Sequence, residues 1–148
     1  MIDQSLQAVA LWAGLNLGWT LLLALNVTRH RMKEGVSTGS GSSQSLDRAV
    51  RAHGNNIEYV PGAILGILIL AALGYSPLVI NLLGASLLVA RFCHAHGIQQ
   101  LEVDLPKTRV LGNVLTWALY LVVVLSLIHI SEPTRPLYIS YAVFCLKK

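Results

Sequence analysis

The chain has 148 residues, of which 54% are hydrophobic and only 12% are charged, whereas an average soluble domain has roughly 45–50% apolar and about 25% charged residues. Low charge, 12 glycines and only 2 cysteines exclude a disordered chain, a collagen-like or coiled-coil rod and a disulfide-rich secreted module. The net charge of +4 does not indicate a nucleic-acid partner, because the basic residues gather at the ends of apolar segments and form no continuous stripe.

The first of four apolar segments covers residues 6–27 and is long enough to cross a bilayer, which takes roughly 20 helical residues. It ends in a basic run at residues 29–33. Asp3 stands where the positive segment of a cleaved signal peptide belongs, so we interpret the span as retained. Gly14 and Gly18 either permit close approach of another helix or reflect the ordinary frequency of glycine in membrane helices.

Residues 35–45 are rich in glycine and serine and predict a flexible loop within one domain. A second helix is predicted over residues 46–73, with Ser45 as its N-cap. The first third of this helix is polar and the rest is apolar. Pro61 lies inside it and predicts a kink, because proline cannot donate the backbone hydrogen bond.

The third span is predicted over residues 77–96, and the fourth begins at Arg109 and continues through residue 124 and beyond. Four antiparallel helices with a short turn between the second and the third predict an all-α transmembrane bundle, one domain over residues 1–124.

The distribution of lysine and arginine predicts the orientation in the membrane. Up to residue 124 these residues lie in the basic loops 28–51 and 97–109, with Arg91 near the end of the third span, whereas the N-terminal segment and the turn at residues 74–77 hold none. The positive-inside rule therefore predicts that both basic loops are cytoplasmic.

The C-terminal residues 125–148 differ in character from the rest. The runs LSLIHISEPTR (125–135) and ISYAVFCLKK (139–148) resemble the frame translation of a transposon-type sequencing adapter followed by a flow-cell primer, in the expected order and spacing. We therefore expect the natural sequence to stop near Val124 and the remainder to be an adapter-derived tail without function. The alternative is a genuine polar tail with a second short apolar segment.

A polar stripe marks the beginning of the second helix. Arg51, Asn55 and Glu58 are spaced four and three residues apart, so they share one helix face with Tyr59 beside them. Charged groups near a membrane span usually face the bundle interior or an aqueous cavity. This stripe suits a zwitterionic peptide-like ligand, in which Arg51 binds a carboxylate, Asn55 an amide and Glu58 an ammonium group. The alternative is an intrahelical ladder that only neutralises charge, and the spacing favours neither.

No metal site is predicted. His94 and His96 are two residues apart and therefore do not share a helix face, and no cysteine or carboxylate supplies a third ligand. Cys93 and Cys145 form no CxxC or Cys/His ligand spacing.

The run RAVRAHGNNIEYVP at residues 48–61 resembles the signature of the MAPEG family (membrane-associated proteins in eicosanoid and glutathione metabolism), R-A-x-x-N-x-x-E-x-x-P on the second helix. It is similar in particular to the small bacterial inner-membrane branch, in which HGN-x-x-EY-x-P follows a basic, glycine-containing first loop. The likeness extends to residues 90–97 at the end of the third span.

This resemblance implies a homotrimer in a bacterial inner membrane that binds glutathione, as a co-substrate, at subunit interfaces near the cytoplasmic face. It implies a glutathione transferase or peroxidase acting on lipophilic electrophiles or hydroperoxides. The glutathione contacts that it implies are Arg51, His53, Asn55, Glu58, Tyr59, Arg91 and His94. The arginines that it implies for stabilising a thiolate are Arg109 and Arg31, because a nearby cation favours the thiolate over the thiol.

Departures from the family pattern narrow the reaction class. The eicosanoid branch carries tyrosines on its third helix where this chain has His94 and Ile98, which argues against leukotriene synthesis. The alternative function is a non-catalytic membrane protein whose polar stripe on the second helix stabilises a trimer.

Overall fold

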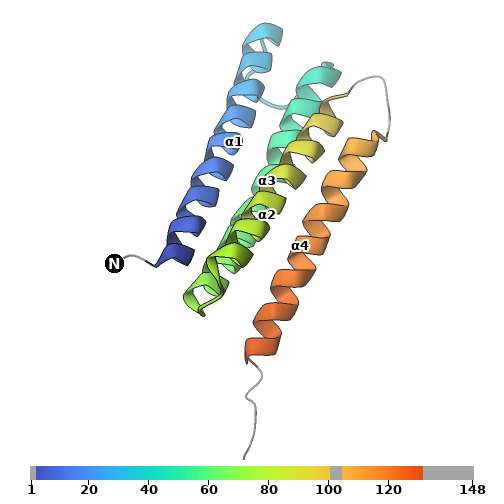
Figure 1. Ribbon diagram of the computed structural model, residues 1–148. Coiled ribbons are helices and arrows are strands. Elements are labelled where there is room, and N and C mark those ends of the chain that lie inside the picture. The colour runs from blue at the N-terminus through green and yellow to red at the C-terminus, as the bar shows by residue number, and fades with distance from the viewer. Residues whose placement is uncertain (1–2, 101–104, 132–148) are drawn as a thin grey trace, which may run out of the picture.

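The computed structural model describes residues 3–100 and 105–131. These form four α-helices: α1 (Gln4–Glu34), α2 (Gln44–Ala72), α3 (Pro77–Gln99) and α4 (Lys107–Ser131). Successive helices run in opposite directions and form a bundle (Figure 1). Each is long and apolar enough to cross a membrane. The predicted fold class, an all-α bundle of four membrane-spanning helices, is therefore confirmed.

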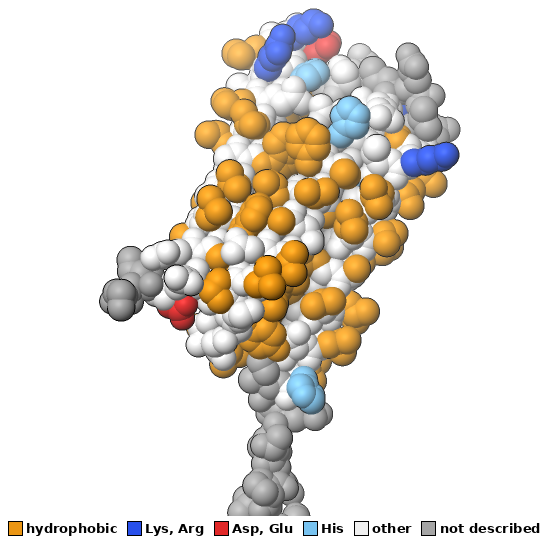
Figure 2. All heavy atoms as spheres, in the orientation of Figure 1, with side chains coloured by type: hydrophobic (Ala, Val, Ile, Leu, Met, Phe, Trp, Pro, Cys, Tyr) orange, Lys and Arg blue, Asp and Glu red, His pale blue; other side chains and the backbone are white. Residues whose placement is uncertain are grey.

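Helices α2 and α3 form the centre of the bundle, and α1 and α4 lie on opposite sides of them (Figure 1). Within the described residues α1 packs on α2 and α3, α4 packs on α3 and α2, and α1 does not contact α4. The outer helices therefore expose large apolar side chains such as Leu17 and Leu121, which form a broad apolar band on the surface (Figure 2). A soluble monomer rarely exposes so large an apolar area, whereas a bilayer matches it.

The first helix is longer than its hydropathy predicts. It begins after Asp3, whose carboxylate accepts a hydrogen bond from the backbone N–H of Ser5 at 2.8 Å. It continues through the basic run at residues 29–33 and ends at Gly35, which adopts a left-handed φ of 65°. Basic side chains in the last turn interact favourably with the helix dipole, so the helix extends beyond the apolar span at residues 6–27.

The predicted N-cap of the second helix is wrong by two residues. Ser43, not Ser45, accepts the capping hydrogen bond, from the backbone N–H of Leu46 at 3.4 Å, so α2 begins at Gln44. Helix α2 runs without a break through Pro61, and the kink expected there stays a prediction. Helix α3 likewise ends at Gln99, beyond the predicted residue 96, and α4 begins at Lys107, two residues before Arg109.

A polar layer divides the apolar core in two. One apolar cluster contains Ala8, Val9, Ala63, Ile67, Leu70, Ala71, Ile80, Leu87, Leu119 and Val123. The other contains Leu23, Ala52, Ala95 and Ile98 and lies nearer the loop between α1 and α2. Buried polar side chains from all four helices lie between them: Asn16, Asn56, Arg91, His94 and Thr116. Such groups are costly in an apolar interior unless they are hydrogen-bonded, so the layer requires a specific network.

Two glycines allow α3 and α4 to approach closely beside this layer. A Cβ at Gly112 would lie 2.5 Å from the backbone nitrogen of His94, and a Cβ at Gly97 would lie 2.4 Å from the backbone nitrogen of Arg109. By contrast, nothing lies within 4 Å of a Cβ at Gly14 or Gly18. Among the described glycines, the close approach of one helix backbone to another therefore occurs between α3 and α4, and not at the small-xxx-small step of α1.

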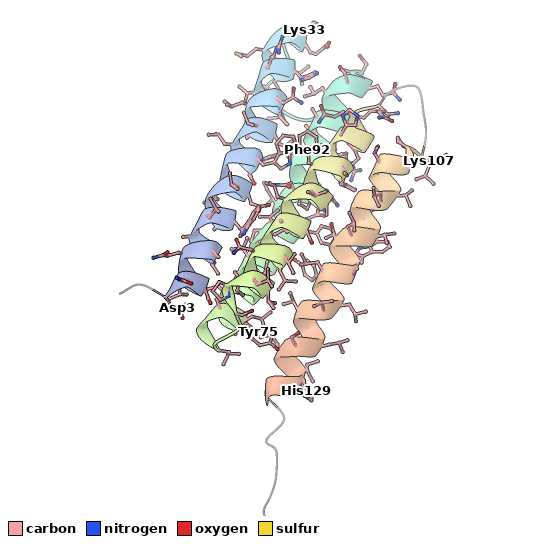
Figure 3. All side chains as sticks on the ribbon, viewed as in Figure 1. Asp3, Lys33, Tyr75, Phe92, Lys107 and His129 are labelled. Carbon is pink, nitrogen blue, oxygen red and sulfur yellow. The ribbon has the colours of Figure 1, made fainter. Side chains whose placement is uncertain are left out.

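The two ends of the bundle differ in charge. Lys33 and Lys107 lie at one end, and Asp3, Tyr75 and His129 lie at the other (Figure 3). The loop between α1 and α2 is at the basic end, where Arg31 donates a 2.6 Å hydrogen bond to the carbonyl of Ser37. We call this the basic end, and its cytoplasmic orientation stays a prediction.

The expected domain limit at residue 124 does not coincide with the end of a helix. Helix α4 continues without a break to Ser131, and Leu127 packs against the larger apolar cluster. Most of the tail that resembles an adapter, residues 132–148, lies outside the described residues.

Candidate functional site

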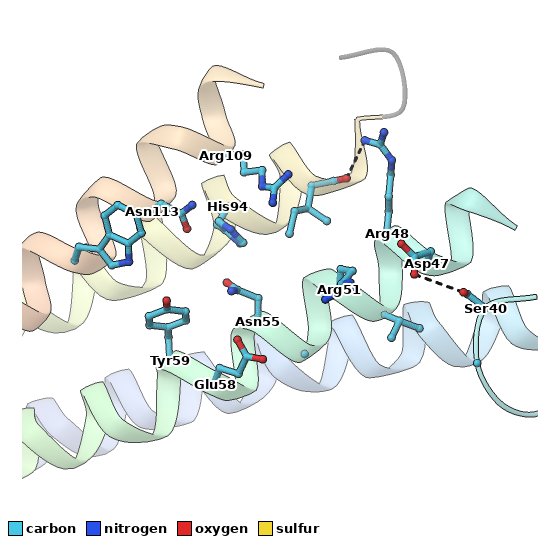
Figure 4. A pocket seen from close by; sticks show the side chains of 15 residues that line it. Ser40, Asp47, Arg48, Arg51, Asn55, Glu58, Tyr59, His94, Arg109 and Asn113 are labelled. Carbon is cyan, nitrogen blue, oxygen red and sulfur yellow. Dashed lines mark hydrogen bonds between the residues drawn. The ribbon is translucent and has the colours of Figure 1, made fainter. Parts of the chain in front are cut away.

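A polar pocket of about 750 Å³ lies at the basic end of the bundle (Figure 4). Helix α2 forms one wall, α4 forms the opposite wall, and α3 contributes side chains between them. The residues that line it are Gly39, Ser40, Asp47, Arg48, Val50, Arg51, Gly54, Asn55, Glu58, Tyr59, His94, Ile98, Arg109, Asn113 and Trp117. Its volume lies within the range of roughly 300–1,000 Å³ that is usual for small-molecule sites.

The α2 wall carries the predicted polar stripe. Arg51, Asn55, Glu58 and Tyr59 all line the pocket, as their shared helix face requires (Figure 4). In the described part of the chain no hydrogen bond or ion pair joins Arg51, Asn55 and Glu58 to one another. The charged groups of Arg51 and Glu58 and the NH₂ group of Asn55 therefore remain available to a ligand or to a second copy of the chain, whereas Asn55 Oδ1 accepts from Arg91.

The α4 wall is a stripe of one residue per turn. Arg109, Asn113 and Trp117 are four residues apart, so they share a face. Gly97 and Gly112 bring α4 close to α3 beside this face, and Arg109 consequently lies over His94 (Figure 4). The pocket therefore holds a cation close to a histidine on one side and a carboxylate, Glu58, on the other.

Arg91 lies behind the pocket and is fully buried. Its Nη1 donates to Thr116 Oγ1 at 3.2 Å, and its Nη2 donates to Asn55 Oδ1 and contacts His94 Nδ1 at 3.1 Å. Its guanidinium carbon lies 5.3 Å from the centre of the Tyr59 ring, within the range of a cation–π interaction. The charge is thus stabilised by neutral partners from α2, α3 and α4.

Tyr59 is held from the α4 side as well. Its ring meets Tyr120 edge-on with 5.8 Å between the ring centres, a favourable aromatic geometry. The Tyr120 hydroxyl donates to the backbone carbonyl of Tyr59. The two contacts fix the Tyr59 ring at the pocket wall.

Six of the nine predicted site residues line one pocket: Arg51, Asn55, Glu58, Tyr59, His94 and Arg109. The other three do not line it. Arg91 is buried behind the wall, His53 is half-buried on α2, and Arg31 points to the loop carbonyl of Ser37.

The sequence prediction missed several lining residues, among them Arg48, Asn113 and Trp117. The last two could have been found from their spacing of four and eight residues after Arg109. Arg48 donates to the backbone carbonyls of Ile98 and Gln100, so it caps the end of α3 and holds that end against α2.

Comparison with known proteins identifies the family. The model of the MAPEG family matches residues 9–129. The chain belongs to the MAPEG family. It is 32% identical over 117 residues to the inner membrane protein YecN of Escherichia coli K12, and the match covers 79% of this chain and 87% of that protein. YecN of Escherichia coli O6:H1, strain CFT073, matches to the same extent.

Membership of MAPEG and the four apolar helices confirm the predicted location: the chain is an integral inner-membrane protein. Its exposed apolar faces on α1 and α4 therefore contact lipid. The polar pocket lies at one end of this apolar band, at the level expected for a site that meets both the aqueous phase and the membrane.

Proposed function

We propose that this MAPEG protein binds glutathione in the polar pocket and uses it as the thiol substrate of a transferase or peroxidase. The observation that carries the proposal is the convergence of Arg51, Asn55, Glu58 and Tyr59 with Arg109 in one pocket. These are the positions that the family signature identifies as glutathione contacts, together with the arginine at the start of α4.

The charges of the pocket complement those of glutathione. Three arginines, Arg48, Arg51 and Arg109, and two carboxylates, Asp47 and Glu58, line it, so its side chains carry a formal net charge of +1. Glutathione carries two carboxylates and one ammonium group at neutral pH and has a net charge of about −1. Arg51 binds a carboxylate, Asn55 an amide and Glu58 the ammonium group.

Arg109 is the candidate for stabilising the thiolate. A free thiol has a pKa of about 8.5 and is mostly protonated at neutral pH, and an adjacent guanidinium favours loss of its proton. The thiolate then forms a carbon–sulfur bond to an apolar electrophile. It either displaces a leaving group such as a halide, which departs with the electron pair of its bond to carbon, or adds to a polarised double bond, whose other carbon takes up the proton that the thiol lost. With a hydroperoxide it attacks the terminal oxygen and releases the alcohol, and a second glutathione reduces the resulting sulfenic acid to give the disulfide and water.

The homotrimer is part of the same proposal and rests on the family. Arg31 does not reach the pocket of its own protomer, so a catalytic role for it requires the pocket of a neighbouring subunit.

Calorimetric titration of glutathione into the purified protein tests the proposal. We expect saturable binding that Arg51→Ala and Glu58→Gln weaken by at least tenfold, since each removes one charged contact. The matched controls are Lys33→Ala and Glu34→Gln, which remove the same charges at exposed positions outside the pocket. Equal affinity of all four variants and the parent would contradict the proposal.

One observation favours the alternative of a non-catalytic trimer. Arg51 and Glu58 are exposed in the protomer, so a neighbouring subunit could bury them. On this alternative Arg51→Ala and Glu58→Gln dissociate the oligomer in detergent, and the parent protein shows no thiol-dependent turnover. Size-exclusion chromatography with light scattering separates the two functions, because the glutathione site predicts an unchanged oligomer.

A further inference from the structure

We infer that Arg91 is a positioning residue, which makes His94 and Asn55 present N–H groups, and not acceptor atoms, to the ligand in the pocket. The inference concerns the direction of the three hydrogen bonds that Arg91 makes, which are those to Thr116, Asn55 and His94. It holds for any ligand of the pocket, and only its application to glutathione rests on the proposed function.

The protonation of His94 follows from its partner. Arg91 Nη2 lies 3.1 Å from His94 Nδ1, and a guanidinium has donors but no acceptor. His94 Nδ1 must therefore be the acceptor and carry no hydrogen. A neutral imidazole then has its hydrogen on Nε2, which has no hydrogen-bond partner in the described part of the chain. Because His94 lines the pocket, Nε2–H is the group that it offers there.

The amide of Asn55 is oriented by the same guanidinium. Asn55 Oδ1 accepts from Arg91 Nη2, and the opposite amide orientation would place two donors against each other. The NH₂ group of Asn55 therefore points away from Arg91. It has no other partner among the described residues, and the side chain lines the pocket.

Arg91 cannot easily reverse these directions. It is fully buried and its other terminal nitrogen donates to Thr116 Oγ1 at 3.2 Å. The Thr116 hydroxyl donates in turn to the carbonyl of Gly112 at 2.7 Å, so its lone pairs face Arg91. This chain of donors runs from Arg91 to the backbone of α4 and ends on an atom that can only accept.

Hydrogen-bond donors are therefore gathered in one part of the pocket. His94 Nε2–H on α3, the Asn55 amide on α2 and the Arg109 guanidinium on α4 are all donors that line the pocket (Figure 4). The part of the pocket between them therefore recognises an acceptor such as a carboxylate, a carbonyl or a thiolate, and it rejects an ammonium group. The ammonium group of a zwitterionic ligand must lie at Glu58 or Asp47, which fixes the direction in which the ligand binds.

His30 provides an internal control with the opposite tautomer. Its Nδ1 lies 2.8 Å from the backbone carbonyl of Asn26, which can only accept. His30 therefore carries its hydrogen on Nδ1, whereas His94 carries it on Nε2.

Nitrogen NMR of protein labelled with ¹⁵N-histidine in nanodiscs tests this directly, at a pH above the range in which histidine titrates. The signals are assigned with His94→Gln and His30→Gln. We expect an unprotonated Nδ1 and a protonated Nε2 for His94, and the reverse for His30. A hydrogen on Nδ1 of His94 would overturn the inference, and this outcome can be observed in the parent protein alone.

Two substitutions of Arg91 separate positioning from packing. Arg91→Lys keeps a donor and should keep the His94 tautomer, whereas Arg91→Met removes the donor and should give a mixture of both tautomers. Thr116→Val removes a different hydrogen bond of Arg91 and should leave the tautomer unchanged. A His94 tautomer that survives in Arg91→Met would also overturn the inference.

Glutathione titration of the same proteins gives a readout that depends on the proposed function. We expect about tenfold weaker binding in Arg91→Met than in Arg91→Lys. If glutathione fails to bind the parent protein while the tautomers are as expected, the proposed function fails and the positioning role of Arg91 stands. Equal affinity of the two variants for a ligand that does bind would overturn the positioning role.

Discussion

Two adjacent asparagines on α2 make hydrogen bonds to different helices. Asn55 belongs to the side of the polar layer that lines the pocket, and Asn56 belongs to the side that packs against α1, which we call the structural side. Asn55 accepts from Arg91 on α3. Asn56 is fully buried on the other side and donates to Thr20 Oγ1 of α1 at 2.8 Å. These two neighbouring residues therefore connect α2 to α3 at the pocket and to α1 on the opposite side.

Thr20→Val tests the structural side. The substitution removes the acceptor of Asn56 Nδ2 and leaves a buried amide unpaired, so the free energy of unfolding should fall by about 1–3 kcal/mol. The measurement is reversible unfolding in mixed micelles with increasing SDS.

Thr28→Val is the matched control for this substitution. Thr28 and Thr20 both donate to the carbonyl four residues earlier, but Thr28 is exposed and receives no hydrogen bond from another helix in the described part of the chain. Its substitution should change the unfolding free energy by less than about 0.5 kcal/mol. Equal stability of Thr20→Val and Thr28→Val would show that the Asn56 hydrogen bond does not stabilise the bundle.

The residues that the sequence places together most directly, and that also line the pocket, are those whose shared face is fixed by the helix period alone. Arg51, Asn55 and Glu58 share a face for any straight helix, and the pocket contains all three. The place of Arg91 depends on how α3 is rotated against α2 and α4, which the spacing of its neighbours along the chain does not determine. The family signature groups Arg91 with the ligand contacts, whereas the packing puts it behind them.

Helix ends were predicted less well than helix existence, for a related reason. Hydropathy reports which residues match the bilayer, and Arg29, Arg31 and Lys33 do not. These residues nevertheless have good helix propensity and lie in the last turns of a helix, where cations are favourable, so α1 continues to Glu34. The apolar span at residues 6–27 is therefore shorter than the helix that contains it.

The contact between α3 and α4 determines where the α4 wall of the pocket lies. Gly112 lies against the backbone of α3 at Ala90 and His94, and it is three residues from Arg109 and next to Asn113. Small residues at such contacts are the usual means by which membrane helices pack, since lipid gives no hydrophobic driving force between them.

Gly112→Ala tests this contact. The new Cβ would lie 2.5 Å from the His94 nitrogen and 2.7 Å from the Ala90 oxygen, both backbone atoms, so α4 must shift. Overpacking of this kind costs about 1–3 kcal/mol, and we expect a loss of unfolding free energy of that size in the SDS titration. The control is Gly14→Ala, where the added Cβ meets nothing within 4 Å and helix propensity predicts an unchanged or slightly higher stability. Stability that falls equally in both variants would contradict the specific role of Gly112.

The molecule as a whole has one basic end and one end with little charge, separated by an apolar band (Figure 2). The pocket opens among the arginines of the basic end. Since basic loops are retained on the cytoplasmic side, the orientation predicts that the pocket draws its polar ligand from the cytoplasm, where thiols are kept reduced.

Cysteine labelling in spheroplasts determines the orientation. In a Cys93→Ser, Cys145→Ser background, Ser42→Cys places a thiol in the exposed loop between α1 and α2, and Ser76→Cys places one in the exposed turn before α3. A maleimide that cannot cross the membrane should label Ser76→Cys in intact spheroplasts and Ser42→Cys only after permeabilisation. Both thiols should react in detergent, which controls for accessibility. The reverse pattern would place the arginine-lined pocket on the periplasmic side, where a reduced cytoplasmic thiol could not reach it, and would contradict both the orientation and the supply of ligand that the basic end predicts.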